Sequence, residues 1–250
     1  MKQPDLMDHP AAELSAPGRR WDTGALWTVA VLAAWAGVFW FLWASGSWAL
    51  HVSSRIFWVV PFGAIVLTAG AIGRLVGARR PHASRFTTRQ AAALALLAVP
   101  VATILAMPST ALGTYAAARR GAYTGGISVT DISAANDSQL QIAVSAALYE
   151  PDVLTALARR AGDEVTFTGF VTHQPGTLSD EFQLNRFVVT CCIADALNAE
   201  VRVVDVTGGP YASGQWVTVT GALYPLQDEI LLDAEKIASI PRPKHPYLNG

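Results

Sequence analysis

The chain has few charged residues, and whole stretches have none. Asp, Glu, Lys and Arg make up 15% of its 250 residues, whereas a typical soluble domain is about a quarter charged. A helix needs about 20 apolar residues to cross a bilayer core of about 30 Å. The uncharged gaps are near or above that length, so they argue against a purely soluble fold and predict membrane-spanning helices. The gaps lie between Asp22 and Arg55, between Arg55 and Arg74, and between Arg89 and Arg119.

Cysteines and catalytic motifs are equally scarce. The two cysteines, Cys191 and Cys192, are adjacent, and two cysteines cannot form the disulfide framework of a small secreted domain. The sequence contains no P-loop, dinucleotide fingerprint, nucleophile–base pair or carboxylate dyad of defined spacing, so nothing in it supports an enzyme. The apolar stretches hold no Asp, Glu or Lys that would mark an ion path. The chain therefore does not read as a complete transporter by itself.

The charges are divided unevenly between the two halves of the chain. Residues 1–120 carry 11 Lys or Arg and 4 Asp or Glu, a net charge of +7. Residues 121–250 carry 7 Lys or Arg and 15 Asp or Glu, a net charge of −8. A nucleic-acid ligand needs clustered Lys and Arg. The acidic second half therefore argues against nucleic acid as a partner and indicates a separate solvated domain.

Three apolar segments are predicted to span the membrane. A polar tail over residues 1–24 precedes them, and the spans lie at about residues 25–43, 56–76 and 90–107. Tryptophans near the ends of the first segment fit the aromatic belt of a membrane interface. A cleaved signal peptide, processed near Ala44, is the alternative for this segment. The length of the apolar run and the two further segments favour a span.

The arginines of the connecting loops predict the orientation in a cell membrane. The loop between the first two segments holds only Arg55. Short loops rich in Lys and Arg stay in the cytoplasm, so we expect a multi-pass protein whose domain after the third span is extracytoplasmic. Arg119 and Arg120 oppose this orientation weakly. The loop that we expect in the cytoplasm holds five arginines: Arg74, Arg79, Arg80, Arg85 and Arg89.

The second half is predicted to be a small all-β, OB-like barrel. Residues 108–136 are rich in Ser, Thr, Gly and Ala and read as a linker, and residues 137–161 read as one or two short helices. From Asp163 the apolar residues alternate with a period of two, which is typical of strands. We predict a domain over residues 137–240 and an extended tail over 241–250; an SH3-like barrel or a small sandwich is the alternative. The predicted strands lie at about residues 163–172, 185–193, 200–206, 215–223 and 229–237.

The adjacent cysteines are the sharpest local feature of the predicted barrel. Neighbouring side chains of a strand point to opposite faces. If the second strand continues through the pair, Cys191 shares the apolar face of Phe187 and Val189, and Cys192 is the more accessible thiol. Cys192 would then form a metal or thiol site, or a redox switch, with Asp195. The alternative is that both cysteines are small, semi-buried residues of the barrel.

Four further residues complete the candidate site. Cys191 and His173 are added to Cys192 and Asp195 as metal ligands, and a divalent metal such as zinc is the cofactor that this set would take. Arg186 and Trp216 are candidates for contact with a ligand or a partner, because Trp216 begins the fourth strand and offers a face for stacking. A loop histidine is more often simply solvated, and a tryptophan at the start of a strand more often packs against the edge of the core.

The second half resembles a family of bacterial membrane proteins. The carrying segments are Gly169–Val171, Arg186–Asp195, Gly214–Gly221 and Pro241–Leu248, and the Cys-Cys-x-Ala-Asp run is the most specific. Together they resemble the YcgQ-like proteins, which are described as permease subunits. This resemblance implies a multi-span permease partner of an anion or metal transporter type, and a link to zinc homeostasis.

Two functions follow as expectations. The first is an accessory membrane subunit of a permease, with lipid bilayer and permease as partners and an outward barrel that contacts the partner or a solute. The second is a membrane-tethered thiol- or metal-handling protein, a metallochaperone or redox sensor, that acts without a permease. An oligonucleotide-binding barrel is disfavoured by the acidic charge and the few aromatic residues on the strands.

Overall fold

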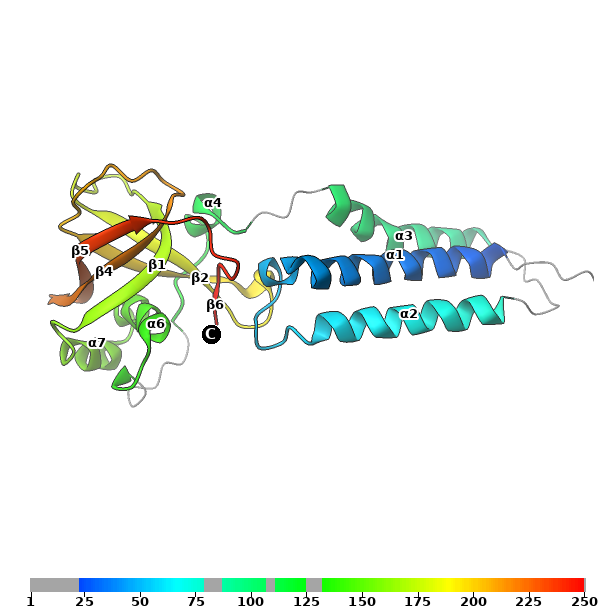
Figure 1. Ribbon diagram of the computed structural model, residues 1–250, viewed down its shortest axis with the longest axis horizontal. Helices are drawn as coiled ribbons and strands as arrows, with labels where there is room; N and C mark the ends of the chain where they lie inside the picture. The colour runs from blue at the N-terminus through cyan, green and yellow to red at the C-terminus, as the bar shows by residue number, and fades with distance from the viewer. Residues whose placement is uncertain (1–22, 79–86, 107–110, 125–131, 250) are drawn as a thin grey trace, which may run out of the picture. The chain divides into compact units, whose positions relative to one another are not determined.

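The computed structural model describes residues 23–78, 87–106, 111–124 and 132–249 (Figure 1). The chain divides into two compact units. The first comprises Met1–Phe39 and Gly63–Ala106, and the second comprises Trp40–Phe62 and Met107–Gly250. The predicted N-terminal tail up to residue 22 and the part of the basic loop with Arg79, Arg80 and Arg85 lie outside the described residues.

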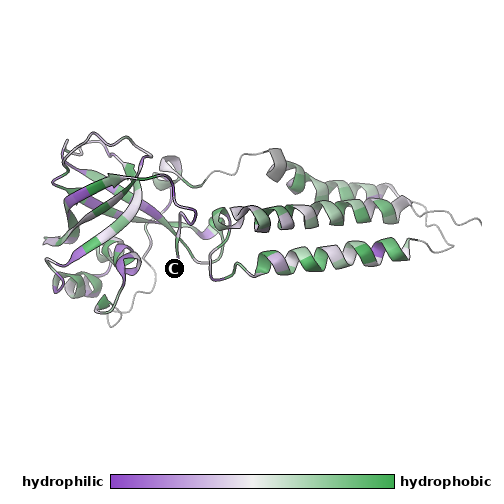
Figure 2. Cartoon of the chain, viewed as in Figure 1, coloured by the Kyte–Doolittle hydropathy of each residue, from purple (hydrophilic) through white to green (hydrophobic). Residues whose placement is uncertain are grey.

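Three apolar helices correspond to the three predicted segments: α1 (Thr23–Ser45), α2 (Val59–Gly77) and α3 (Thr88–Ala106). By length and composition, α1 and α2 are able to cross a membrane, and only 17% and 11% of their most apolar windows are buried. A core helix of a soluble protein would be mostly buried, so these two helices indicate membrane association. The described apolar part of α3 is shorter, so the predicted count of three spans is not confirmed. Figure 2 shows hydrophobic residues around these helices.

Small residues bring the helices of the first unit together. A Cβ added to Gly63 on α2 would lie 2.8 Å from the Phe39 ring of α1, so a larger residue would require this ring to move. The indole Nε1 of Trp35 on α1 donates to the carbonyl oxygen of Leu97 on α3 at 3.0 Å. Small residues at helix contacts and polar bonds between helices are both typical of membrane bundles.

The second unit contains a closed barrel of five strands, the strand number of the predicted OB-like fold. The order around the barrel is β1-β4-β5-β3-β2, and β1 also pairs with β2, which closes it. All neighbours are antiparallel except β3 and β5. The strands are β1 (Glu164–Thr172), β2 (Phe182–Val189), β3 (Leu197–Val204), β4 (Trp216–Leu226) and β5 (Glu229–Ser239).

Two short helices precede the barrel, where the sequence predicts one or two, and they contact its strands. Helix α6 (Asp137–Ala147) begins at a capping box of Asn136 and Gln139, and α7 (Pro151–Ala158) begins with proline at its first turn. Helix α6 contacts β3, β1 and β5 (Figure 1). Its apolar residues, such as Leu140, join the main core of inward-facing strand residues, including Phe167 and Leu232.

Two glycines allow the strands to close around this core. A Cβ added to Gly169 of β1 would lie 2.5 Å from the carbonyl oxygen of Asn185 on β2. A Cβ on Gly221 of β4 would collide with the carbonyl oxygen of Asp233 on β5, beside an irregularity in the β4–β5 pairing. Glycine in a strand often marks such a close approach of two backbones.

Three segments differ from their predicted form. The predicted linker 108–136 includes helix α4 (Thr114–Ala117) and a bridge between Ala122 and Asn198 of β3. The predicted extended tail forms β6 (Leu248–Asn249), which pairs in parallel with β2. The second strand ends at Val189, before the cysteines, instead of running to about residue 193. The bridge of Ala122 and the pairing of β6 depend on partners far away in sequence, which a local pattern does not contain.

Candidate functional site

The cysteines lie in a turn and not in a strand, which overturns their predicted placement. Because β2 ends at Val189, strand alternation does not apply to the pair. Cys191 is exposed and Cys192 is half-buried, the reverse of the prediction that Cys191 points into the core. Both are free thiols, and their sulfur atoms lie 3.7 Å apart.

Asp195 explains why the strand stops. Its carboxylate accepts the backbone N–H of Cys191 at 2.7 Å and that of Thr190 at 3.2 Å, two groups that a continuing strand would give to a neighbour. Aspartate commonly competes with regular structure in this way. The chain then forms a short 3₁₀ helix, Ile193–Asp195. The aspartate of the Cys-Cys-x-Ala-Asp run therefore builds the turn that displays the cysteines.

Arg120 closes the other side of the turn. Its Nη1 donates to the carbonyl oxygens of Ile193 at 2.9 Å, Ala194 at 3.4 Å and Ala196 at 2.8 Å. The backbone of residues 121–123 pairs with β3 alongside, since the N–H of Tyr123 donates to the carbonyl of Asn198. In the sequence, Arg120 is only a charge that weakly opposes the predicted orientation, because nothing local links it to a turn 73 residues further along.

The connection between α1 and α2 pairs with the same turn. The N–H of Ser53 donates to the carbonyl of Cys191 at 3.0 Å, and the N–H of Ile193 donates to the carbonyl of His51 at 2.8 Å. Val52 and Cys192 thus form an antiparallel bridge. Residues 46–58 consequently belong to the barrel unit, although more than 130 residues separate them from the turn in sequence.

The C-terminal segment holds this connection from a further side. The Oδ1 of Asn249 accepts the hydroxyls of Ser53 at 3.2 Å and Ser54 at 2.8 Å. The hydroxyl of Tyr247 accepts the N–H of Leu112 at 3.2 Å and donates to the carbonyl of Leu50 at 3.4 Å. We call the four segments that meet here, residues 46–58, 111–123, 190–196 and 245–249, the junction.

Arg186 and Trp216, the predicted contact residues, are both engaged within the chain. Arg186 donates to the carbonyls of Pro246 at 3.2 Å and His245 at 3.1 Å, and burial lowers the pKa of its guanidinium. Trp216 packs against Phe170, with ring centroids 5.7 Å apart. Arg186 therefore positions the C-terminal segment, and Trp216 extends an apolar cluster beside the junction.

The electrostatics of the turn keep the exposed thiol protonated. Hydrogen bonding to Asp195, then to Cys192, raises the pKa of Cys191 to about 11. Partial burial alone would raise the pKa of Asp195, but hydrogen bonds from Cys191, Thr190 and Cys192 outweigh it and lower the pKa below its ordinary value. Because a thiolate is the reactive form of cysteine, Cys191 is a poor nucleophile near neutral pH.

The structure does not assemble the predicted metal ligands. His173 lies in an exposed loop, where its Nδ1 is 3.3 Å from the hydroxyl of Ser213, while Cys191, Cys192 and Asp195 meet in the turn. Among the described residues, no group of three or more His, Cys, Asp or Glu side chains is placed to hold a metal ion. Asp195 is committed to backbone N–H groups, so the turn offers two thiols, fewer than the four ligands of a structural zinc site.

The chain combines helices that indicate membrane association with a closed barrel of five strands. Residues 133–249 match the family model of the DUF1980 C-terminal domain, a bacterial domain family of unknown function. The match covers the barrel, helices α6 and α7, and the Cys-Cys-x-Ala-Asp run. It carries no mention of YcgQ or of a permease, so those parts of the resemblance stay predictions.

Two other comparisons add little. No curated protein matches the chain. The structure of the hypothetical protein ygiW from E. coli aligns with 34% of this chain and 84% of that chain, at 14% sequence identity and a TM-score of 0.25. At that TM-score the likeness carries no argument about the fold of the barrel.

Proposed function

We propose that the protein is an accessory subunit of a membrane permease, anchored by its helices, with the barrel outside the cytoplasm for contact with the partner or a solute. The observation that carries this proposal is the junction. The connection between two membrane-type helices is built into the barrel unit through the Val52–Cys192 bridge. An anchored binding domain needs such a fixed attachment, whereas a freely tethered domain does not.

The junction also supports the proposed topology of three spans. Residues 46–58 follow α1, and the barrel follows α3. If only α1 and α2 crossed the membrane, this connection and the barrel would lie on opposite sides, and Val52 could not pair with Cys192. A third crossing by α3 puts both on one side. The arginine-rich loop after α2 favours an extracytoplasmic location for that side.

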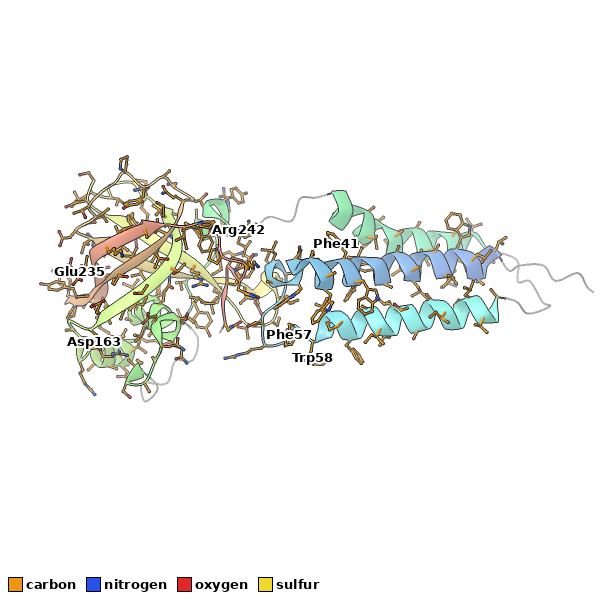
Figure 3. All side chains as sticks on the ribbon, viewed as in Figure 1. Phe41, Phe57, Trp58, Asp163, Glu235 and Arg242 are labelled. Carbon is orange, nitrogen blue, oxygen red and sulfur yellow. The ribbon has the colours of Figure 1, made fainter. Side chains whose placement is uncertain are left out.

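The apolar surface of the helices favours a partner within the membrane. Large side chains at the ends of α1 and α2 remain exposed in the single chain; Phe41 is 64% and Trp58 is 55% exposed (Figure 3). Lipid or further helices must cover them, and no acidic residue or lysine in the three helices offers an ion path. A partner with its own path would supply what this chain lacks.

Purification in mild detergent tests the partner. The tagged full-length protein is extracted from its native membrane, and co-purifying proteins are identified by mass spectrometry. We expect a multi-span permease at constant stoichiometry, and reduced recovery for Asp195→Ala, which removes the acceptor that holds the turn. The matched control is Asp228→Ala on the exposed β4–β5 connection. Recovery of the chain without any permease would refute the proposed function.

Cysteine labelling tests the topology independently. Ser213→Cys on the barrel and Arg55→Cys in the connection are made in a Cys191→Ser, Cys192→Ser background, and both positions are exposed. An impermeant maleimide applied to intact cells should label both. Labelling of only one would exclude the third crossing, and labelling of neither without opening the membrane would reverse the orientation.

A membrane-tethered thiol- or metal-handling protein is the second candidate, favoured by the two free sulfur atoms 3.7 Å apart. A soft metal ion binds thiolates, so binding requires both thiols to lose their protons. Metal analysis of the purified protein distinguishes the candidates. Stoichiometric zinc that disappears in Cys191→Ser and Cys192→Ser would favour this function, and no zinc above the double serine variant would reject it.

A further inference from the structure

A pocket of about 550 Å³ lies beside the junction, and its lining comes from two distant segments. One segment is the end of α1 with the turn that follows, from Trp43 to Leu50. The other is the stretch from Arg242 to His245, between β5 and β6. All lining residues belong to the second unit, so the pocket is a property of the barrel unit itself.

The pocket is basic although the domain around it is acidic. Arg242, Lys244 and His245 line it, and no Asp or Glu does. In the described part of the chain, the ion pairs involve Arg160 and Arg202, and neither Arg242 nor Lys244 takes part in one. Residues 121–250 carry a net charge of −8. Two uncompensated cations at one place in such a domain favour an anionic ligand, and phosphate is one of the anions that Arg and Lys bind through charge-assisted hydrogen bonds.

The other wall of the pocket is aromatic. Trp43 and Trp48 line it, and the rings of Trp48 and His245 lie 5.4 Å apart. Trp43 also stacks on Phe57, at 6.1 Å between ring centroids. Tryptophans at the end of a membrane-crossing helix lie at the depth of the lipid headgroups. A small soluble anion has no apolar part that could pack against this wall, whereas a phospholipid presents a phosphate and an acyl chain together.

We propose that this pocket binds the headgroup of an anionic phospholipid, with Arg242 and Lys244 on the phosphate and the tryptophans against the glycerol and upper acyl chain. Arg242 lies beyond the end of β5 (Figure 3). The proposal rests on α1 crossing the membrane, but it does not require a permease. Bound lipid would connect the C-terminal segment to the end of α1 and so reinforce the junction from the membrane side.

Lipid retention by the full-length protein tests the proposal. The protein is purified in mild detergent, mixed with phosphatidylglycerol or phosphatidylcholine, and analysed by native mass spectrometry. We expect selective retention of phosphatidylglycerol, weakened about tenfold or more by Arg242→Gln combined with Lys244→Gln, since each basic side chain near a membrane contributes appreciably to anionic-lipid binding. The exchange of the two types, Arg242→Lys with Lys244→Arg, should keep most of the retention.

The controls separate this site from general charge effects. Arg159→Gln combined with Lys236→Gln removes the same charge from exposed positions of the same domain and should leave retention unchanged. Equal loss in both double variants, or equal retention of the two lipids, would overturn the proposal. Displacement of the lipid by millimolar inorganic phosphate, or by an acidic segment of a co-purified protein, would also overturn it, because the site would then serve another anion. The maleimide labelling tests the topology separately. A wrong topology can therefore be distinguished from a failure of lipid binding.

Discussion

The barrel core and the junction lie in one unit, but different forces hold them. The core consists of apolar side chains at or near zero exposure, such as Phe167, Leu184 and Leu232, which are stabilised by removal from water. The junction consists of hydrogen bonds in which Arg120 and Tyr247 satisfy backbone groups of other segments and Asp195 satisfies those of its own turn. Each such bond contributes about 1 kcal/mol net. The core therefore determines whether the barrel folds, and the junction determines what it is attached to.

The largest effect should come from the core. Gly221→Ala places a methyl group against the carbonyl oxygen of Asp233, so β4 and β5 must separate. We expect a loss of about 2–3 kcal/mol in the free energy of unfolding, measured by thermal melting in detergent. Gly121→Ala is the control, since nothing lies within 4 Å of its added Cβ. Equal melting of the two variants would show that the strands tolerate the change.

A smaller loss is expected when the junction loses Arg120. Arg120→Met keeps the aliphatic stem but leaves the carbonyls of Ile193 and Ala196 without their donor. We expect a loss of about 1–2 kcal/mol and faster proteolysis at residues 46–58, with β content unchanged by circular dichroism. Arg119→Met, at an exposed neighbour that lies over the Tyr115 ring, should have little effect. Collapse of the barrel signal would mean that junction and core are not separable.

Removing the charge of Asp195 should act on thiol chemistry more than on stability. Asp195→Asn removes the main cause of the raised pKa of the Cys191 thiol. In a Cys192→Ser background, Cys191 of this variant should therefore be alkylated about tenfold faster near pH 8. Asp228→Asn is the control. Unchanged alkylation would disprove the assigned hydrogen bond.

The carboxylate of Asp195 also makes stability depend on pH. Because the pKa of Asp195 is lowered in the folded state, its contribution to stability is present above the ordinary value of 3.8 and is lost as the pH falls through the lowered pKa.

The smallest effects should come from the cysteines. Cys192 is half-buried and Cys191 is exposed, so Cys192→Ser should lower stability by about 0.5–1 kcal/mol and Cys191→Ser by less than about 0.5 kcal/mol. This order is the opposite of what strand alternation predicts. Chemical denaturation of the two variants distinguishes the turn from the predicted strand. A larger loss of stability for Cys191→Ser than for Cys192→Ser would support the strand.

The same division explains what the sequence could and could not reveal. Long uncharged apolar runs predicted α1, α2 and α3, and turn residues predicted the short helices. The period of two predicted the five strands, because that pattern repeats within a few positions. Periodicity misplaced the end of β2, because a single carboxylate at Asp195 interrupts the strand. It missed Arg120, Tyr247 and Asn249, whose partners lie far away in sequence. The Cys-Cys-x-Ala-Asp run was found as a motif, but its role as a turn required the neighbouring segments.

The pairing of Val52 with Cys192 has a consequence for biosynthesis. Ribosomes make the chain from the N-terminus, so the connection after α1 is made before its partner turn exists. Until about 140 further residues emerge, the backbone groups of His51 and Ser53 have only water or a chaperone to bind. Attachment is thus a late event, and a chain interrupted before residue 190 would have the connection without the turn that it pairs with.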